Sequence, residues 1–157
     1  MLVPGDIPDN QAYVTYHSPG GEFRIDHPEG WAQSGAGSSV AFSDKFNSIR
    51  VDVVGAAAAP SVGAAPKSDV PAISASAHCF QPGRISQLSR TAGPAVLITY
   101  VADSNPDPVT GKVVRQDVER YEFWQAGKQA NITLASPVKS DNVDPWRKVT
   151  DSFAWGP

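Results

Sequence analysis

The sequence predicts an α+β sandwich in which a largely antiparallel central sheet of six to seven strands carries one helix on each face. Several segments alternate apolar and polar residues as half-buried strands do, and two others carry an apolar stripe at helical spacing. The segment 95–102 is apolar on both sides, so the sheet must be covered on both faces. A length of 157 residues suits one domain, which we expect at 13–157 after a flexible, Pro/Gly-rich lead-in or tether at 1–12.

The first predicted strand lies at 22–27. Phe23 and Ile25 face one side of it, and charged side chains face the other. The strand must end at Pro28, which has no N–H for a strand ladder, and the turn that follows brings Trp31 toward the core.

A hairpin is predicted next, after a Gly/Ser-rich turn at 34–39. Its two strands span 40–43 and 48–55. The second strand carries three apolar residues on its inner face, namely Ile49, Val51 and Val53.

The first helix is predicted at 68–80. The preceding stretch, 55–67, is rich in alanine, but proline and glycine interrupt it every few residues, so we expect a loop there. Ser68 or Asp69 can cap the helix, and Pro71 falls in its first turn, where a missing N–H is tolerated. The apolar stripe of this helix consists of Val70, Ile73, Ala77 and Phe80.

Four strands are predicted between the two helices, at 84–91, 95–102, 113–125 and 130–135. Both faces of the second one are mostly apolar, so it is expected to be a central strand covered on both sides. A turn at 103–112 follows it, and the last two strands are expected to pair antiparallel around a short turn.

A second helix is predicted to close the chain. It begins near Asn142 and has Pro145 in its first turn. Basic residues follow toward its C-terminal half, where they interact favourably with the helix dipole. Its apolar stripe consists of Val143, Trp146, Val149 or Thr150, and Phe153.

The composition argues against several function classes. The formal net charge of −3 gives no basic footprint, which disfavours nucleic acid and an anionic membrane surface as partners. The single cysteine, Cys79, can form neither an internal disulfide nor a thiolate metal cluster. No segment is apolar over the roughly 18 residues that a membrane-spanning helix needs.

Several segments together resemble a known fold family. They are Phe23–Trp31, Val40–Phe42, Arg90–Ala95 with Leu97–Tyr100, and Val149–Phe153, and their order and spacing extend over roughly 13–155. This ordered set resembles the PsbP-like fold, which includes the extrinsic PsbP proteins of photosystem II, DcrB-type bacterial lipoproteins and a Ran-binding import factor of eukaryotes. The resemblance implies the sandwich described above and a non-enzymatic accessory, assembly or adaptor role.

The sequence contains no catalytic or nucleotide-binding motif. We therefore expect a non-enzymatic, extracytoplasmic accessory or binding protein of a bacterium, whose partner is an unknown protein or small ligand. We expect it to be a lipoprotein whose membrane contact is a removed lipid anchor upstream of this chain. Two alternatives stay open: a cytoplasmic adaptor or chaperone that binds a partner protein, and a metal-binding protein or hydrolase.

The best metal candidate is the predicted turn after the central strand. Oxygen ligands from Asp103, Asn105 and Asp107 alternate there as at the start of a calcium loop. However, Pro108 stands where such a loop has glycine, and the same residue types form ordinary hairpin connections. We therefore expect no cofactor, with calcium or another divalent metal as the alternative at this turn.

Histidine and cysteine chemistry has weaker support. A zinc or manganese site would draw on His17, Asp26, His27 and Glu29, but no close His pair is present, so packing at a strand end explains His27 better. Cys79 follows His78, yet adjacent residues of a helix point about 100° apart. We expect Cys79 to be a buried or half-buried, inert thiol in the first helix.

Two of the four tryptophans are candidate partner-binding residues. Trp124 lies on a strand flanked by polar residues, and Trp155 lies beyond the apolar stripe of the last helix. An exposed tryptophan at either position would anchor a contact with a protein or a small ligand.

Overall fold

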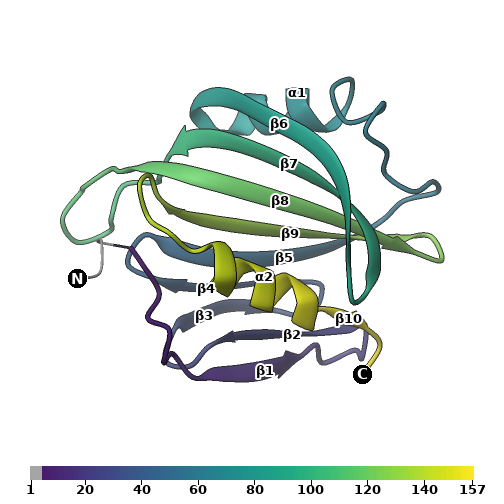
Figure 1. The fold of residues 1–157 in the computed structure, drawn as a ribbon, viewed down its shortest axis with the longest axis horizontal. Helices are drawn as coiled ribbons and strands as arrows, with labels where there is room; N and C mark the ends of the chain where they lie inside the picture. Colours follow the sequence, from purple (N-terminus) through teal and green to yellow (C-terminus); the bar gives the residue numbers. More distant parts are fainter. Residues whose placement is uncertain (1–4) are drawn as a thin grey trace.

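Over residues 5–157, which the computed structural model describes, the chain forms ten strands and two helices (Figure 1). In chain order these elements are β1 (Tyr13–His17), β2 (Phe23–Pro28), β3 (Ala32–Ala36), β4 (Ser39–Asp44), β5 (Asn47–Gly55), α1 (Asp69–Ser76), β6 (His78–Arg90), β7 (Gly93–Asp103), β8 (Arg115–Gln125), β9 (Lys128–Pro137), α2 (Val143–Ser152) and β10 (Ala154–Trp155). Neither helix has the length and apolar character needed to cross a membrane.

The strands form two antiparallel sheets. The large sheet has the order β3-β4-β5-β9-β8-β7-β6, and the small sheet has the order β1-β2-β10. The predicted α+β fold with a central antiparallel sheet of six to seven strands is therefore confirmed. The predicted hairpin of the last two long strands is also present, because Gln125 of β8 faces Lys128 of β9 across a two-residue turn.

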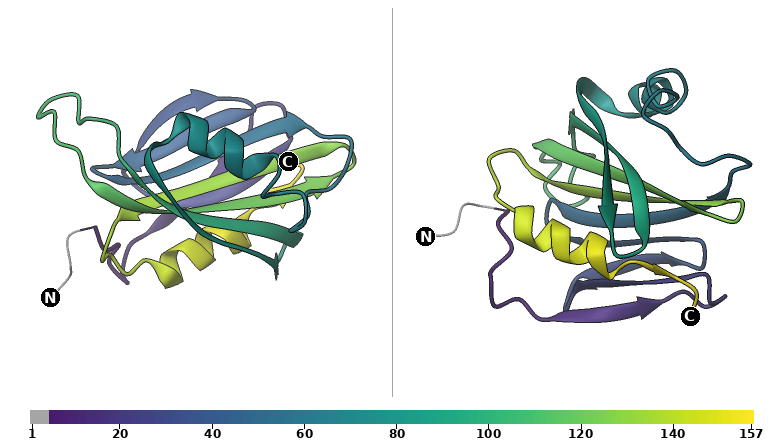
Figure 2. Two further views of the ribbon diagram at one scale, coloured as in Figure 1. Left: turned by 90° about the horizontal axis from the view of Figure 1, so that it is seen from above. Right: turned by 45° about the vertical axis from the view of Figure 1, so that its right-hand side comes forward.

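The two faces of the large sheet are covered by different layers. One face, here called the α2 face, carries α2 and the small sheet beside it (Figures 1 and 2). The opposite face, here called the α1 face, carries α1 over β6 and β7. A helix lies on each face as predicted, but the small sheet is a further layer that the sequence did not predict.

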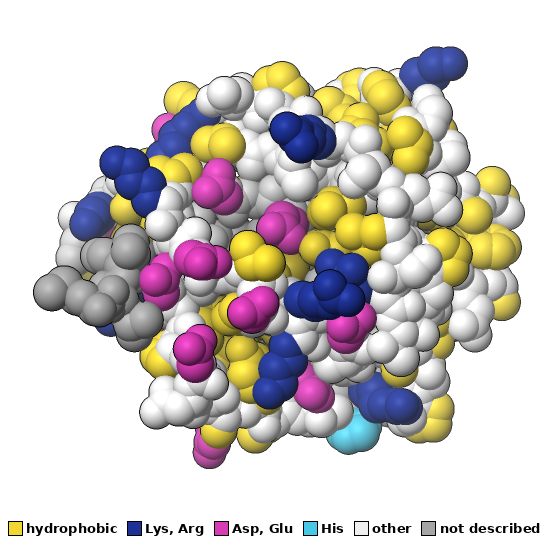
Figure 3. Space-filling view, in the orientation of Figure 1, with side chains coloured by type: hydrophobic (Ala, Val, Ile, Leu, Met, Phe, Trp, Pro, Cys, Tyr) yellow, Lys and Arg dark blue, Asp and Glu magenta, His cyan; other side chains and the backbone are white. Residues whose placement is uncertain are grey.

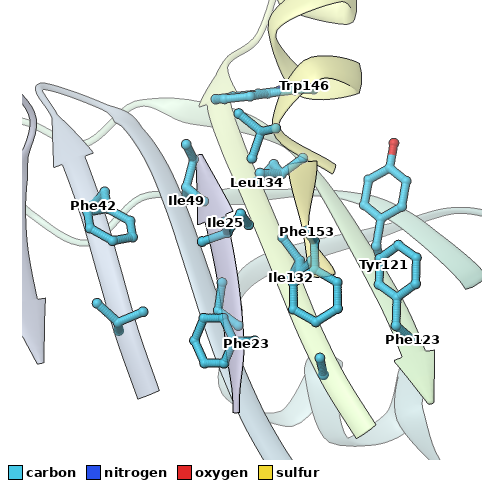
Figure 4. Packing of buried hydrophobic residues seen from close by; sticks show 14 of the residues in the cluster. Phe23, Ile25, Phe42, Ile49, Tyr121, Phe123, Ile132, Leu134, Trp146 and Phe153 are labelled. Atoms are coloured by element: carbon cyan, nitrogen blue, oxygen red, sulfur yellow. The ribbon is translucent and has the colours of Figure 1, made fainter. Parts of the chain in front are cut away.

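The main core lies between the large sheet and the layer formed by α2 and the small sheet (Figure 4). The ring of Phe153, which follows α2, is fully buried, with centroids 5.2 Å from Phe123 of β8 and 5.9 Å from Phe23 of β2. Phe23 and Ile25 are both fully buried, as their alternation predicted. Trp31 packs against this core and is half-buried.

A second, smaller core lies under α1. Ile73 of α1 packs with Val96 and Ile98 of β7, and the rings of Phe80 and Tyr100 lie 5.4 Å apart beside them. Since the next apolar residues along β7 face the main core, β7 is buried from both sides as predicted.

The helix α1 is shorter than predicted. It ends at Ser76, and Ala77 already has extended backbone angles of φ −83° and ψ 149°. His78 pairs with Asp103 of β7, so the strand ladder replaces the last turn of the predicted helix. The expected cap is also absent, because the Ser68 hydroxyl donates to the carbonyl of Ala64 at 3.1 Å instead.

Three strands were not predicted, namely β1, β3 and β10. In β3, which occupies part of the expected turn at 34–39, all five residues are exposed, so no apolar alternation marks the strand. Its pairing with β4 defines it instead. The two-residue strand β10 exists because Trp155 pairs with Phe23, a contact that sequence alternation does not encode.

The segment before β1 is attached to the domain from Gly5 onward, whereas residues 1–4 of the predicted lead-in lie outside the described residues. The Gly5 carbonyl accepts hydrogen bonds from the side-chain amides of Asn47 and Asn142, both at 2.9 Å. Ile7 is buried, and its N–H donates to Asn142 Oδ1 at 2.8 Å. Asn142 stands at the start of α2 as expected, but its side chain holds this segment and does not cap the helix.

Candidate functional site

The α1 face of the large sheet is largely polar where α1 does not cover it. One row of directly paired residues crosses five strands on this face, and it consists of Val96, Glu122, Asn131, Asp52 and Ser39. At its far end, Asp52 accepts hydrogen bonds from Ser39 at 2.6 Å and from Arg50 at 2.9 Å. The row therefore passes from the small core under α1 onto an open polar surface.

Glu122 is the unusual member of this row. Its side chain is fully buried, and Oε2 accepts a hydrogen bond from Arg120 Nε at 3.0 Å. Oε1 has no geometric hydrogen-bond partner among residues 5–157, but the carboxyl group of Asp69 lies close enough to share a hydrogen bond with the carboxyl group of Glu122. Burial raises the pKa of Glu122 to about 7, against the opposing charge of Arg120, and the neighbouring carboxyl group of Asp69 raises it further.

A pocket of about 170 Å³ opens beside Glu122 at the end of β7 and β8. The residues that line this Glu122 pocket are Ala59, Pro60, Gln87, Pro94, Ala95, Val96, Glu122 and Trp124. The indole Nε1 of Trp124 donates to the carbonyl of Ala56 at 2.9 Å, which fixes the ring against the loop that precedes α1. The pocket thus combines a buried carboxyl group, an oriented aromatic wall and an apolar rim, the ordinary composition of a small binding site.

Comparison with solved structures finds the same arrangement of strands and helices in proteins of several lineages. The cyanobacterial PsbP (CyanoP) of Synechocystis sp. PCC 6803 is 14% identical, with a TM-score of 0.59 over 96% of this chain and 97% of that one. The Ran-binding protein Mog1p of Saccharomyces cerevisiae is 9% identical, with a TM-score of 0.59 over 92% and 95% of the two chains. The chain has a PsbP-like fold.

A third structure, from Bacteroides thetaiotaomicron VPI-5482, is 11% identical and has a TM-score of 0.56. The match covers 91% of this chain but only 48% of that one, so the PsbP-like fold here spans about half of that protein. Comparison of the sequence with protein-family models and with curated proteins found no match. At these identities the likeness concerns the fold alone.

The two predicted tryptophans lie on different sides of this PsbP-like fold. Trp124 is half-buried and forms the wall of the Glu122 pocket on the α1 face. Trp155 is also half-buried, but it belongs to the small sheet, and its ring meets Phe153 edge-on at 5.3 Å. The structure therefore brings Trp124, but not Trp155, into the candidate site.

The turn predicted as a possible calcium loop has other internal partners. Asp103 is paired with Arg115 at 3.0 Å, and this hydrogen bond lowers the pKa of Asp103. Asp107 Oδ1 accepts the backbone N–H groups of Thr110 and Val109, both at 2.8 Å, which lowers the pKa of Asp107 and closes the turn. Asn105 is exposed. These contacts are those of an Asx-type turn.

The histidines near the first strands do not converge. His27 stacks on Phe42 with ring centroids 3.9 Å apart and an interplanar angle of 8°, while His17 is exposed on β1. Asp26 accepts a hydrogen bond from Thr15 at 2.6 Å. Among residues 5–157, no three His, Cys, Asp or Glu side chains are grouped so as to hold a metal ion.

The prediction of a buried or half-buried Cys79 in a helix was wrong. Cys79 is exposed and lies in β6 with a φ of 51°, at an irregularity in the pairing with β7. A hydrogen bond to the Asp103 carboxylate raises the pKa of the Cys79 thiol. The thiol is therefore held in its protonated, weakly nucleophilic form.

A larger hollow of about 320 Å³ lies on the α2 face, beside the start of α2. Of its two carboxylates, Glu119 accepts the Tyr121 hydroxyl at 2.8 Å, and Asp117 is exposed to solvent rather than enclosed. Acidic and basic side chains lie among one another on this side of the molecule (Figure 3). We therefore place the candidate site at the Glu122 pocket.

Sequence reasoning missed the central residue of the site. Glu122 alternates with Tyr121 and Phe123, which face the core, so no apolar pattern in the sequence marks it as a buried residue. The available signal was strand β7, which is apolar on both faces. Its antiparallel neighbour β8 must therefore place one of its polar residues against the face that α1 covers. Val96 pairs with Glu122 in this way.

Proposed function

We propose that this protein is a non-enzymatic accessory or binding protein, and that the Glu122 pocket is where it contacts its partner. The observation that carries the proposal is an open pocket with the aromatic wall of Trp124, apolar neighbours and the exposed side chain of Gln87, beside the buried carboxyl group of Glu122. Two proteins with the same fold, a Ran-binding protein and a cyanobacterial PsbP, are compatible with a binding role. At this low sequence identity, the structural similarity supports the shared fold but not a particular partner.

The arrangement of candidate nucleophiles supports a non-enzymatic role. A catalytic thiol needs a lowered pKa, whereas the pKa of Cys79 is raised by its hydrogen bond to Asp103. His27, the histidine packed at the strand end, is stacked on Phe42, and its Nδ1 lies 3.0 Å from the Pro28 carbonyl. His27 is therefore not directed at a nucleophile, and the hydrogen bond from Cys79 to Asp103 favours the thiol over the thiolate that covalent catalysis requires.

A site-specific cross-linking experiment tests the contact. A photoreactive amino acid is placed at Gln87, which is exposed at the pocket, and at Val14 of β1 as a matched exposed control. We expect irradiation of native cells to give one discrete adduct from position 87 and none from position 14. Adducts of the same size from both positions, or none from position 87, would contradict the proposal.

We further propose that the protein is extracytoplasmic and is held at the membrane by a lipid on a cysteine upstream of this chain. The proposal rests on the resemblance to bacterial lipoproteins with this fold and on a Pro/Gly-rich N-terminal segment. Palmitate labelling and fractionation of the native host are expected to place the protein with the membranes. A protein found unlabelled in the cytoplasm would instead favour the cytoplasmic adaptor.

A divalent metal stays the alternative for the turn with Asp103, Asn105 and Asp107. Elemental analysis of protein purified without chelators tests it directly. We expect less than stoichiometric calcium and no transition metal, because the two aspartates are already engaged by Arg115 and by backbone N–H groups. One calcium ion per chain that is lost on Asp107→Ala substitution would establish the metal site.

A further inference from the structure

We propose that the hollow on the α2 face is a docking surface for a partner protein, and that it receives an arginine or lysine side chain from an exposed segment of that partner. The hollow has a volume of about 320 Å³ and lies between the start of α2 and the strands β7 and β8. It is on the opposite face of the large sheet from the Glu122 pocket, so the inference goes beyond the proposed function and does not rest on it.

The hollow is present because α2 covers only part of this face of the large sheet. The helix packs Trp146 and Val149 into the main core, and near its end Thr150 accepts a hydrogen bond from Arg90 of β6 at 2.9 Å. Nearer its start, four side chains of β7 and β8 line the hollow, and none of them is buried: Thr99, Val101, Asp117 and Glu119. They form two directly paired couples of the strand ladder. This part of the sheet therefore lacks a covering layer.

The charged side chains that line the hollow are both acidic. Basic side chains occur elsewhere on this face, but none belongs to the lining that residues 5–157 provide. Asp117 is exposed, and its carboxylate has no hydrogen bond or ion pair within the described part of the chain. Glu119 uses Oε1 to accept the Tyr121 hydroxyl, which leaves Oε2 for another donor. Arg115, two residues along β8 from Asp117, is bound to Asp103 at 3.0 Å. The hollow therefore presents negative charge that no neighbouring cation neutralises.

A buried hydroxyl group faces the same hollow. Ser136 of β9 is only 4% exposed, lines the hollow and lies directly opposite Asp117 in the ladder. Its hydroxyl has no hydrogen-bond partner in the segment 5–157. It is also not one of the polar atoms that are sealed from solvent, a set that includes Glu122 Oε1, so a ligand in the hollow can reach it. An unpaired buried hydroxyl is unfavourable, and a donor next to Asp117 would satisfy it.

The rim of the hollow suits the alkyl stem of a basic side chain. Val143 at the start of α2 is 70% exposed, and Val101 and Trp146 lie beside it in the lining. Arginine and lysine pack their methylene groups along such apolar surface and direct the charged group to polar partners. Arginine fits best, because its fork of N–H groups can bind a carboxylate and a hydroxyl at the same time.

The size and shape of the hollow favour a segment of a protein over a free small molecule. A cavity of roughly 150 Å³ holds a molecule the size of benzene, so about 320 Å³ accommodates one basic side chain and part of a neighbouring residue. Small-molecule sites usually enclose most of their ligand, whereas Asp117 and Val143 are exposed here. The two carboxylates would repel an anion. No third His, Cys, Asp or Glu within 5–157 joins them to hold a metal ion.

Two acetylated, amidated tripeptides test the recognition of charge: Leu-Arg-Leu and its neutral isostere Leu-citrulline-Leu. Each is titrated into the ¹⁵N-labelled whole chain, and NMR follows the Ser136 amide and the Trp146 indole N–H. We expect the arginine peptide to bind with a dissociation constant on the order of 1 mM at low salt, about ten-fold more tightly than the citrulline peptide, and more weakly as salt is added. Equal binding of the two peptides, or no shift of either signal at roughly 20 mM arginine peptide, would overturn the proposal.

Three substitutions locate the interaction. Asp117→Asn should weaken binding of the arginine peptide by about five-fold, and Ser136→Ala by about three-fold. Asp44→Asn is a matched control, because Asp44 is also exposed and lies at the end of β4, outside the hollow. Unchanged binding in Asp117→Asn, or an equal loss in Asp44→Asn, would place the peptide elsewhere and contradict the proposal. The comparison of the two peptides on the natural chain stands even if a variant fails to fold.

Two further measurements separate the possible occupants. We expect n-butylguanidinium, a free cation of the same chemistry, to bind more weakly than the arginine peptide; equal affinity would replace the docking surface with a small-molecule site. Sedimentation should show a monomer, and a dimer that dissociates on Asp117→Asn substitution would make the occupant a second copy of the chain.

Cross-linking in native cells then tests the docking surface itself. A photoreactive amino acid at Val143 should give an adduct that Asp117→Asn diminishes and Asp44→Asn does not. An adduct unaffected by Asp117→Asn, or no adduct, would count against this surface. The adduct expected from Gln87 reports on the opposite face of the sheet, so either proposal can fail while the other stands.

Discussion

The ionisation of Glu122 makes a quantitative prediction about stability. The pKa of Glu122 is raised from 4.5 to about 7 by burial and by Asp69, whereas an unfolded chain has the ordinary value. The folded state therefore holds more protons than the unfolded state between these two values. Stability from this group is fully present below pH 4.5 and is lost as the pH rises through 7.

A shift of about 2.5 pKa units at about 1.4 kcal/mol each gives about 3 kcal/mol between pH 4 and pH 8. Glutamine cannot ionise, so Glu122→Gln should match the natural protein at pH 4 and exceed it by up to about 3 kcal/mol at pH 8. In a chain of this length that corresponds to roughly 6–12 °C in melting temperature.

Urea unfolding of both proteins at intervals from pH 4 to pH 8, followed by circular dichroism, measures this difference. Asp107→Asn is a control whose effect should not change with pH in this range, because the pKa of Asp107 is lowered from its ordinary value of 3.8 by its backbone hydrogen bonds. The stability that Asp107 contributes is present above its ordinary pKa and is lost as the pH falls through the lowered value. A difference between Glu122→Gln and the natural protein that does not change with pH would refute the reasoning on Glu122.

Three further predictions concern the fold and Cys79. Ala126→Gly should stabilise the β8–β9 turn by roughly 1 kcal/mol in urea unfolding, because Ala126 has a φ of 49° that glycine adopts without strain; a loss of stability would contradict a left-handed conformation there. Phe153→Ala should cost roughly 3–5 kcal/mol by the same assay, because the fully buried ring joins α2 to both sheets; a loss below 1 kcal/mol would mean that the core is not centred on it. Asp103→Asn should speed alkylation of Cys79 by iodoacetamide at pH 8, since the carboxylate raises the pKa of the thiol; an unchanged or slower rate would exclude that contact.

The sequence was sufficient for the elements whose burial follows a period. Phe23 and Ile25 alternate with charged residues, and Trp146 and Val149 lie three residues apart, so each element shows which side is buried. The same logic failed for β3, whose five residues are all exposed and therefore show no alternation of buried and exposed positions. It also failed at the end of α1, where pairing of His78 with Asp103 overrode a weak helical stripe.

The Glu122 site could not be predicted for a related reason. Alternation divides β8 correctly into residues that face the core and residues that do not, but it does not say what covers the second set. The cover over Glu122 comes from Asp69 and from the loop that holds Ala56, both more than fifty residues away in the chain. Only the tertiary arrangement turns an ordinary strand glutamate into a buried one.

This partial cover explains why the proposed binding site is compatible with the stability of the fold. The α2 face is sealed by aromatic packing around Phe153, so the main core does not depend on the opposite side of the sheet. On the α1 face the helix has eight residues and its only buried residue is Ile73, so little apolar area holds it against β7. A carboxyl group whose burial requires a proton or a cation can therefore persist beside α1. The free-energy cost of burying this group destabilises only the less strongly packed layer of the molecule.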